Sequence, residues 1–363
     1  MSDEVYMERA IALAERGLGC VSPNPMVGAV VVAGDRVVGE GWHEGPGLPH
    51  AEIVALNAAG ELARGATLYT TLEPCCHFGR TPPCTDAIVR SGIARVAAAA
   101  TDPNPVVHGR GLERLRDAGV EVREGVLEEI AERMNEAFAT HVRTGLPLVV
   151  WKVAATLDGK AAARDGSSRW ISGEAARADV HRLRAWSDAI VVGSGTALAD
   201  DPSLTVRDPA YRGDPPLRVL VDGRGMVPAS GALFDDRAPT LVATTEIAPR
   251  GRREAWDAVG AEVRVYEGEH VPLRELVADL GKRDVQGLLL EGGPTLAYAA
   301  VEAGLVDRVV VYLAPKLIGG RDAPGVLGGG GLAPIASAVP LQIRSFERLG
   351  DDLRVEADVH RDR

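Results

Sequence analysis

The stretch Thr71–Cys84, TLEPCCHFGRTPPC, contains three of the four cysteines of this 363-residue chain. It follows a short strand-like run, Thr67–Thr71, and leads into a short helical pattern, Thr85–Ser91, which is the order of elements expected in an α/β fold. In a reducing compartment such a cluster of thiols indicates a metal site or a catalytic site rather than disulfides. Because the neighbouring Cys75 and Cys76 cannot easily both bind one metal ion, the question is which thiols are ligands.

A further ligand is predicted upstream, where His50-Ala-Glu52 begins a helical pattern behind Pro49. H-x-E followed later by Pro-Cys is the pattern of the zinc nucleobase deaminases. Three protein ligands leave the fourth position of zinc open to water, and the metal lowers the pKa of that water until hydroxide forms near neutral pH. Glu52 lies two residues from the ligand, so it can take the proton of the water and deliver it to the departing amine.

The spacing of the cysteines leaves two ligand sets open. Eight residues separate Cys75 from Cys84, whereas the general deaminase pattern is Cys-x-x-Cys. His50, Cys75 and Cys84 keep the cysteine after Pro74 as a ligand, and replacing Cys75 by Cys76 shifts that ligand by one position. We prefer the first set, because helix amides next to Cys75 and Cys84 would stabilise both thiolates.

The alternative to a catalytic site is a structural zinc site with four protein ligands. Cys76 or His77 could supply the fourth ligand in that case. The remaining thiol, Cys20, is interpreted as a small buried hydrophobe, which is the usual role of an isolated cysteine.

The rest of the chain alternates helical and strand-like patterns in two halves. In the first half, helices are predicted over residues 5–17, 51–63, 85–91, 107–118 and 126–142, and strands over 27–32, 36–41, 67–71 and 95–100. In the second half, strands are predicted over residues 148–154, 189–192, 218–221, 240–243, 287–290 and 308–313, with helical patterns between several of them. Gly and Pro at 143–147 mark a boundary, so we predict domains over 1–145 and 146–363, the first with a three-layer α/β architecture.

Composition limits the possible functions. The formal net charge of −11 gives no indication of the basic face that nucleic-acid binding requires, and no apolar run approaches the length of a membrane span. The acidic N-terminus lacks the basic start of a signal peptide, so a cytoplasmic location without membrane contact is expected. A small phosphorylated substrate is compatible with this charge, because a few local cations can hold one phosphate.

A second site is indicated by two glycine turns. Val192–Gly195 and Gly292–Gly293 each follow a strand-like run and precede a helical pattern, and free amides at such turns can bind phosphate. Neither is a Rossmann fingerprint, since no G-x-G-x-x-G follows a strand at the start of either half. Arg184 and Arg207 could clamp a phosphate through their guanidinium forks, or could form ordinary solvated salt bridges.

Further motifs surround both sites in a fixed order. They are PNPMVG (23–28), GWH (41–43), HAE (50–52), TLEPC (71–75), GRTPPC (79–84), DPNP (102–105), KVAATLDG (152–159), WIS (170–172), DDPSLTVR (200–207) and EGGPTL (291–296). Together they closely resemble the bifunctional deaminase-reductase of riboflavin biosynthesis, over essentially the whole chain. The long Cys-x8-Cys loop belongs to the pattern of that family.

For the first half, the resemblance implies a cytidine-deaminase-like domain. This domain would hydrolyse an amino group from 2,5-diamino-6-(5-phosphoribosylamino)pyrimidin-4-one, with one zinc ion on His50, Cys75 and Cys84 and with Glu52 as the proton shuttle. Substrate contacts are implied for Asn24, His43, His77, Arg80, Asp102 and Asn104. Cys76 is not a ligand in this assignment.

For the second half, the resemblance implies a dihydrofolate-reductase-like domain that uses NADPH to reduce the ribosyl group of 5-amino-6-(5-phosphoribosylamino)uracil to ribityl. Substrate contacts are implied for Lys152, Ser168, Arg184, Leu204, Arg207 and Glu291. Cofactor contacts are implied for Ala154, Trp170, Thr196, Asp200, Gly223, Gly293, Pro294, Thr295, Leu296, Ala297, Tyr298 and Ala299. The family also suggests a homo-oligomer, either a dimer or a tetramer.

Two other functions remain to be distinguished at this point. One is a zinc deaminase acting on another nucleobase or on nucleic acid, with an inactive second domain; a basic surface and a shorter cysteine spacing would favour it. The other is a zinc-stabilised binding module, in which removal of the Glu52 carboxylate would leave the role of the protein unchanged.

Overall fold

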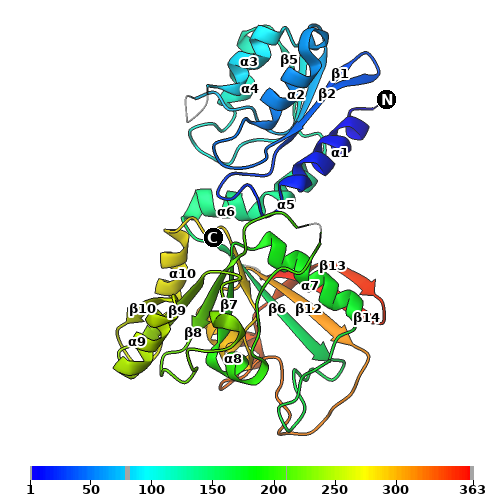
Figure 1. Ribbon diagram of the computed structural model, residues 1–363. Coiled ribbons are helices and arrows are strands. Elements are labelled where there is room, and N and C mark those ends of the chain that lie inside the picture. Colours follow the sequence, from blue (N-terminus) through cyan, green and yellow to red (C-terminus); the bar gives the residue numbers. More distant parts are fainter. Residues whose placement is uncertain (1, 78–81, 210, 360–363) are drawn as a thin grey trace. The chain divides into compact units, whose positions relative to one another are not determined.

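The computed structural model describes residues 2–77, 82–209 and 211–359. The chain divides into two compact units, Met1–Gly145 and Leu146–Arg363 (Figure 1). Both units consist of a sheet with helices on its two faces, so the predicted α/β class is confirmed. Within the described residues, no helix has the length and hydropathy that crossing a lipid bilayer requires.

The N-terminal unit contains a five-stranded sheet in the order β2-β1-β3-β4-β5. Its strands are β1 (Gly28–Ala33), β2 (Arg36–Trp42), β3 (Thr67–Leu72), β4 (Arg95–Ala100) and β5 (Glu121–Arg123). Its helices are α1 (Asp3–Ala14), α2 (Ala51–Ala59), α3 (Cys84–Ser91), α4 (Arg110–Asp117), α5 (Glu128–Met134) and α6 (Glu136–Thr144). Strand β1 is antiparallel to both neighbours, whereas β3, β4 and β5 are parallel. The carboxyl ends of these three strands therefore lie at one edge of the sheet.

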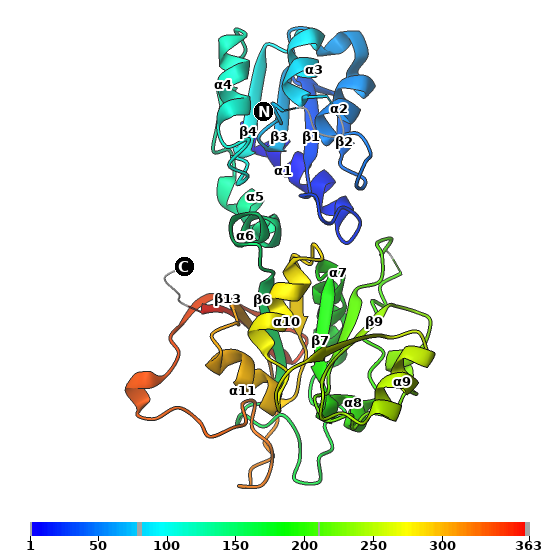
Figure 2. The same cartoon turned by 90° about the vertical axis from the view of Figure 1, so that its left-hand side faces the viewer.

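Alternation along the strands divides the core of this unit into two layers. Ala29 and Val31 of β1 face α2, α3 and α4, whereas Val30 and Val32 face α1 and α5. Side chains two residues apart lie on the same face of a strand, so a nearly continuous apolar run can serve both layers. Figures 1 and 2 show the helices on both sides of this sheet. The three-layer prediction is thus confirmed.

The C-terminal unit contains a nine-stranded sheet in the order β10-β9-β8-β7-β11-β6-β12-β14-β13. Its strands are β6 (Leu148–Thr156), β7 (Ala189–Gly193), β8 (Leu217–Val221), β9 (Thr240–Thr245), β10 (Glu262–Tyr266), β11 (Gly287–Leu290), β12 (Arg308–Ala314), β13 (Leu341–Leu349) and β14 (Asp352–Val359). Its helices are α7 (Glu174–Trp186), α8 (Ser194–Asp200), α9 (Arg250–Ala258), α10 (Leu273–Gly281) and α11 (Pro294–Glu302). All pairings from β10 to β12 are parallel, and β14 and β13 add two antiparallel strands at one end.

Two buried clusters cover the faces of the nine-stranded sheet. Ala176 of α7, Ala197 of α8 and Trp256 of α9 pack on one face, and Leu276 of α10 and Ala297 of α11 pack on the other. In Figure 2, α10 lies in front of the sheet and α7 behind it. The helices follow parallel strands, so the turns that lead into α8 and α11 open at the carboxyl edge of the sheet, where ligands bind in open α/β sheets.

The structure differs from the sequence-based expectation in a few elements. The helix predicted over 126–142 is interrupted at Asn135, whose side chain accepts a hydrogen bond from the Met26 amide and donates one to the Met26 carbonyl, each at 2.8 Å. Strands β5, β10, β13 and β14 were not predicted. They are short or lie towards the ends of the sheets, where exposed side chains weaken the hydrophobic pattern.

Candidate active sites

Three elements of the N-terminal unit bring the predicted zinc ligands together. His50 directly precedes α2, Cys84 is the first residue of α3, and Cys75 follows β3. The Nδ1 atom of His50 lies 3.1 Å from the Sγ atom of Cys84 and 3.6 Å from that of Cys75. The three ligand atoms all lie within 4.8 Å of one another, a spacing that one tetrahedral zinc ion can span. Of the two sets that the sequence leaves open, the structure gathers the one with Cys75.

The two thiols differ in acidity. The Cys84 side chain hydrogen-bonds to Cys75 and lowers the pKa of Cys75 to about 4, while that bond and burial raise the pKa of Cys84. The backbone amide of Cys84, at the N-terminus of α3, also donates to the Sγ atom of Cys75 at 3.3 Å. Two thiolates with an imidazole are a donor set that suits zinc, and a divalent cation that binds them displaces the protons that remain on the cluster.

Glu52 lies in the first turn of α2, beside the ligands. Its side chain is buried, with 3% of the residue exposed, and burial raises its pKa to about 7. A hydrogen bond links it to the Cys84 side chain. A carboxyl group that titrates near neutral pH can both accept and return a proton, which is the role predicted for Glu52.

Asn24 and His43 form a pair next to the ligand His50. The His43 Nδ1 atom lies 3.2 Å from the Pro49 carbonyl oxygen, to which it must donate, so its Nε2 atom accepts a hydrogen bond from the Asn24 side-chain amide at 2.9 Å. Burial lowers the pKa of His43, which favours the neutral ring. The His43 and His50 rings meet edge to face, 5.7 Å apart. The structure thus brings two predicted substrate residues to the metal-binding cluster.

The loop after β4 contains two more of the predicted substrate residues. The Asp102 Oδ1 atom accepts a hydrogen bond from the Asn104 amide at 2.8 Å, and the Asn104 Oδ1 atom accepts one from the Val106 amide at 3.0 Å. Burial raises the pKa of Asp102 to about 6, and His77 lies close enough to oppose this shift. Both side chains therefore shape the loop from within. Arg80, the remaining predicted contact, lies outside the described residues.

Two adjoining cavities lie in the C-terminal unit, with volumes of about 770 and 840 Å³. They share part of their walls, and the shared residues are Lys152, Ala154, Ala161, Ser168, Thr196, Asp200 and Glu291. A hydride donor in one cavity and an acceptor in the other would meet at this common wall. Among the shared residues, Lys152 is basic, whereas Asp200 and Glu291 are acidic.

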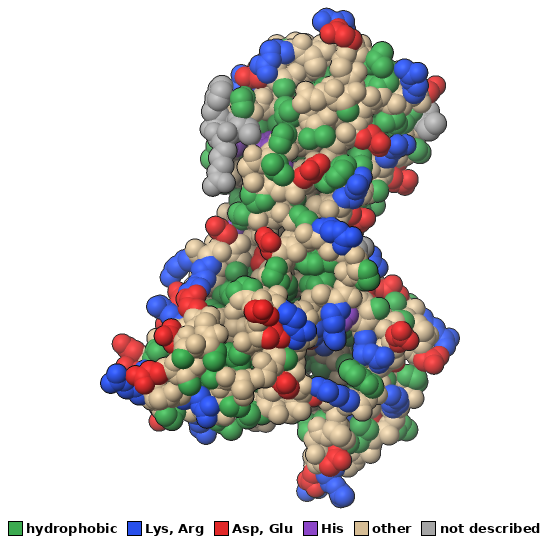
Figure 3. All heavy atoms as spheres, viewed as in Figure 1, with side chains coloured by type: hydrophobic (Ala, Val, Ile, Leu, Met, Phe, Trp, Pro, Cys, Tyr) green, Lys and Arg blue, Asp and Glu red, His purple; other side chains and the backbone are tan. Residues whose placement is uncertain are grey.

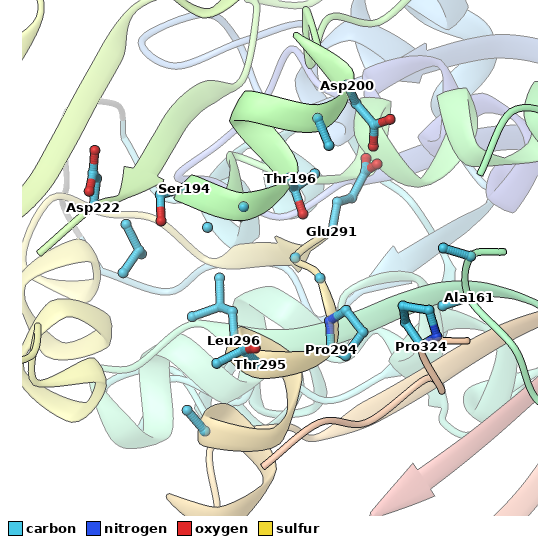
Figure 4. A pocket seen from close by; sticks show the side chains of 18 of the residues that line it. Ala161, Ser194, Thr196, Asp200, Asp222, Glu291, Pro294, Thr295, Leu296 and Pro324 are labelled. Atoms are coloured by element: carbon cyan, nitrogen blue, oxygen red, sulfur yellow. The ribbon is translucent and has the colours of Figure 1, made fainter. Parts of the chain in front are cut away.

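The first cavity opens at the carboxyl edge of the sheet (Figure 4). Ser194 and Thr196 lie at the start of α8, Pro294 and Thr295 at the start of α11, and Asp222 follows β8. Predicted cofactor residues that line it are Ala154, Thr196, Asp200, Gly223, Gly293, Pro294, Thr295, Leu296 and Ala299. Free amides at the starts of two helices suit a pyrophosphate.

Two local features agree with a bound dinucleotide in this cavity. A Cβ atom at Gly293 would come within 3.1 Å of the Thr196 hydroxyl, so the glycine keeps the turn open between the two helix starts. The Oδ1 atom of Asp222 is buried without a hydrogen-bond partner, although its Oδ2 atom accepts the Val227 amide. An unpaired buried acceptor is costly unless a ligand supplies a donor. The residues present therefore fit NADPH.

Three predicted cofactor residues do not line the first cavity. Ala297 faces the core and is fully buried, and the hydroxyl of Tyr298 donates to the Gly331 carbonyl. The resemblance implied that a continuous segment of α11 contacts the cofactor. A helix presents only one face to a cavity, so Ala297 and Tyr298 point elsewhere. Trp170 lines the second cavity, where the Arg177 guanidinium lies 4.7 Å from its ring centroid.

The second cavity is rich in basic side chains. It is lined by the predicted Lys152, Ser168, Arg184, Leu204, Arg207 and Glu291, together with Arg169, Arg177 and His181. Figure 3 shows Lys and Arg side chains gathered around a hollow in the C-terminal unit. Such a cavity suits an anionic substrate within a chain that is acidic overall.

Glu291 is held between two cations at the common wall. Arg184 donates from Nε and Nη2 to its two oxygens at 2.6 and 3.0 Å, and the Lys152 ammonium lies 3.2 Å from one of them. Burial would raise the pKa of Glu291, but Arg184 and Lys152 hold it well below its usual range. The Arg184 fork therefore binds Glu291, which is the ion-pair alternative that the sequence left open; within the described residues, Arg207 has no such carboxylate partner.

Several residues of the sites were not found from the sequence. Glu73 contacts the loop that carries Asp102, and Arg169, Arg177 and His181 line the substrate cavity. A basic side chain looks the same in a sequence whether it faces solvent or a cavity. Of these residues, only Glu73 could have been singled out from the sequence, because it lies within the TLEPC motif.

Comparison with known proteins agrees with this geometry. Residues 147–355 match the family model described as RibD C-terminal domain, and residues 1–100 match the cytidine and deoxycytidylate deaminase zinc-binding region. The chain is 43% identical to the riboflavin biosynthesis protein RibD of Escherichia coli (strain K12), over 97% of this chain and 98% of that protein.

Solved structures give the same result over the whole length. The Acinetobacter baumannii RibD (form 1) superposes with a TM-score of 0.87 at 38% identity, covering 99% of both chains. A diaminohydroxyphosphoribosylaminopyrimidine deaminase/5-amino-6-(5-phosphoribosylamino)uracil reductase from Thermotoga maritima superposes with a TM-score of 0.85 at 37% identity, also covering 99% of both chains. The chain therefore belongs to the RibD family, the bifunctional enzymes of riboflavin biosynthesis that join a zinc-binding, cytidine-deaminase-like domain to a dihydrofolate-reductase-like domain that uses NADPH.

Proposed function

We propose that residues 1–145 hydrolyse the amino group of 2,5-diamino-6-(5-phosphoribosylamino)pyrimidin-4-one. We further propose that residues 146–363 reduce the ribosyl group of the product, 5-amino-6-(5-phosphoribosylamino)uracil, to ribityl. The observation that carries both steps is that one chain holds Glu52 beside the cluster His50, Cys75 and Cys84, and also a basic cavity that shares a wall with a dinucleotide-sized one. The Thermotoga maritima relative is named for the same two activities.

In the deaminase unit, His50, Cys75 and Cys84 would hold the zinc ion. Zinc, when bound, supplies a Lewis acid that lowers the pKa of a coordinated water. Glu52 accepts the proton of the attacking water and donates a proton to the departing amine, a role for which its raised pKa suits it. The neutral His43, oriented by Asn24, offers the pyrimidine a polar contact at the same side of the site.

In the reductase unit, the starts of α8 and α11 would hold the pyrophosphate of NADPH. NADPH, when bound, supplies a hydride. Arg207 and the arginines around Trp170 attract the substrate phosphate in the second cavity. Lys152 and Glu291 lie in the wall that the two cavities share, between the proposed cofactor and the proposed substrate. Their fixed geometry orients the sugar chain for transfer.

A coupled assay with the diaminopyrimidinone nucleotide tests both steps. We expect zinc-loaded protein to release ammonia without NADPH, and we expect subsequent NADPH oxidation to require the deaminated product. Ammonia release from the zinc-loaded chain is the decisive signal, and its absence would overturn the proposal.

We also propose that the protein forms a homo-oligomer, a dimer or a tetramer, through the β13 end of the sheet. Leu341, Ile343 and Phe346 pair with alternate residues of β14, because a bulge between Ile343 and Ser345 restores the register. All three therefore lie on one sheet face, with Ile343 65% and Phe346 77% exposed. An apolar face beside an unpaired strand edge suits a second copy of the same surface.

For its location we propose the cytoplasm, because the site requires reduced thiols. All four cysteines are thiols rather than disulfides in the structure, and two of them belong to the metal-binding cluster. An oxidising compartment would favour disulfides over thiolate ligands.

A further inference from the structure

Glu73 carries a buried carboxylate to which the zinc chemistry assigns no role. It follows β3, and 3% of the residue is exposed. Its Oε2 atom accepts hydrogen bonds from the amides of Asp102 at 3.1 Å and Gly109 at 2.8 Å. Its Oε1 atom accepts hydrogen bonds from the amides of Gly111 at 2.8 Å and Leu112 at 3.3 Å. Four backbone donors thus converge on one side chain.

These four donors belong to two structures that need an acceptor. Asp102 and Gly109 lie at the two ends of the loop after β4, so one carboxylate holds both ends of that loop. Gly111 and Leu112 lie in the first turn of α4, where amides have no partner within the helix. The residue before the helix is Gly109, which has no side chain to cap them. Glu73 supplies the missing acceptor from a distant part of the chain.

The same residue is attached to the metal-binding segment. Glu73 is separated from Cys75 only by Pro74, whose ring restricts the backbone. A Cβ atom at Gly111 would lie 2.0 Å from the Pro74 carbonyl oxygen, so α4 packs directly against this peptide. The Glu73 amide also donates to the Ala100 carbonyl at 2.9 Å, at the end of β4. A shift of the loop or of α4 would therefore also shift Cys75, a zinc ligand. A shift of Cys75 would likewise move the loop and α4.

We propose that Glu73 is a positioning residue of the deaminase, which fixes the loop carrying Asp102 and Asn104 relative to Cys75. Through Glu73, the distance between the metal and the substrate-binding loop is set before the substrate arrives. The inference rests on the proposed substrate contacts of Asp102 and Asn104. It extends them by naming the group that holds their loop at the correct distance from the metal.

The test is Glu73→Gln in the full-length, zinc-loaded protein. The carboxamide keeps the shape and one acceptor oxygen, but its NH₂ group faces two of the four amides. We expect the deaminase KM to rise about tenfold or more, because hydrogen bonds to a charged acceptor are lost, with a smaller change in kcat. Zinc content and the NADPH-dependent reduction of supplied intermediate should remain at the level of the unmodified protein.

Glu113→Gln is the matched control, because it removes the same charge from an exposed position on α4. It should leave the deaminase KM unchanged. An unchanged KM in Glu73→Gln would overturn the proposal. A loss of zinc or of soluble protein, or a fall in kcat at constant KM, would also overturn it, because that is the result of a purely structural role.

Two further variants separate this inference from the proposed function. Asp102→Asn and Asn104→Ala should each raise the deaminase KM. If they do so while Glu73→Gln does not, the positioning role is wrong and the substrate contacts stand. If neither variant changes KM, the substrate contacts themselves are wrong, and the positioning role falls with them.

Discussion

The two units each bury a glutamate at the centre of their site, and the two carboxyl groups behave in opposite ways. Glu52 is 3% exposed, and burial raises its pKa to about 7. The Glu291 side chain is 6% exposed, yet its pKa lies well below the usual range. Burial is nearly equal, so the difference comes from the neighbours. Arg184 and Lys152 flank Glu291, whereas Glu52 has His50 and two thiols beside it.

The difference separates two ways of using a buried carboxylate. A carboxylate with permanent cations remains ionised and serves as a fixed charge, as Glu291 does. A carboxyl group without them titrates near neutral pH and can move protons, which is the role proposed for Glu52. In the deaminase, the missing positive charge is supplied by a metal ion rather than by a side chain, so the two sites should respond differently to loss of their cations.

The largest expected effect is that of losing the metal. Cys75→Ser removes a thiolate from a three-ligand site, so we expect zinc to be lost and deamination to fall to background. Reduction of supplied intermediate should continue, because the cations around Glu291 are covalent parts of the chain. Metal analysis with both assays checks this, and Cys76→Ser, one residue along, should retain zinc and activity. The reverse result would exchange the two cysteines in the ligand set.

Glu52→Gln should separate proton transfer from metal binding. We expect kcat of the deaminase to fall by about 10²- to 10⁴-fold, which is the usual contribution of a general acid or base. Zinc content should be unchanged, because Glu52 is not one of the three gathered ligands. Reductase activity in the same sample serves as the control for folding. Loss of zinc from this variant would make Glu52 a ligand and would contradict its role as a proton shuttle.

Removing a cation from Glu291 should change the pH dependence of the reductase. In Lys152→Met, the pKa of Glu291 should rise, so the acidic limb of the reductase pH profile should move to higher pH. Folding lowers the pKa of Glu291, so its carboxylate stabilises the folded state at pH values above 4.5, the usual pKa of a glutamate. This stabilisation is lost as the pH falls below 4.5. Lys152→Met should therefore also lower the melting temperature at neutral pH. An unshifted profile would show that Glu291 is not the titrating group.

The smallest effect on chemistry is expected at the apolar sheet face. Phe346→Glu places a charge in the proposed contact between copies, so we expect a smaller species in sedimentation velocity. The exposed side chain lies outside both cavities, so the kinetic constants should change by less than about twofold, as is usual for surface substitutions. Gln342→Glu, which adds the same charge at an exposed position on the opposite face of the same strand, is the comparison variant. If the sedimentation coefficient of Phe346→Glu is unchanged, the interface between copies lies elsewhere.

Much of the fold could be predicted from the sequence. Strands such as 95–100 and 287–290 are continuous apolar runs bounded by turns, so their existence is encoded locally. The break at Asn135 was not predictable, because it depends on hydrogen bonds to Met26, more than a hundred residues away. Edge strands such as β13 lack a buried face, and the hydrophobic pattern that identifies a strand disappears with it.

The site shows the same division. His50, Glu52, Cys75 and Cys84 were identifiable because zinc chemistry restricts both residue type and spacing, and these restrictions are written along the chain. The sequence also determined that the chain has two α/β halves with a site in each. Only the tertiary structure decided which arginine is paired with Glu291, which face of α11 lines the cavity, and that four backbone amides donate to Glu73. These depend on side chains far apart in sequence, whose distances exist only once the sheets have formed.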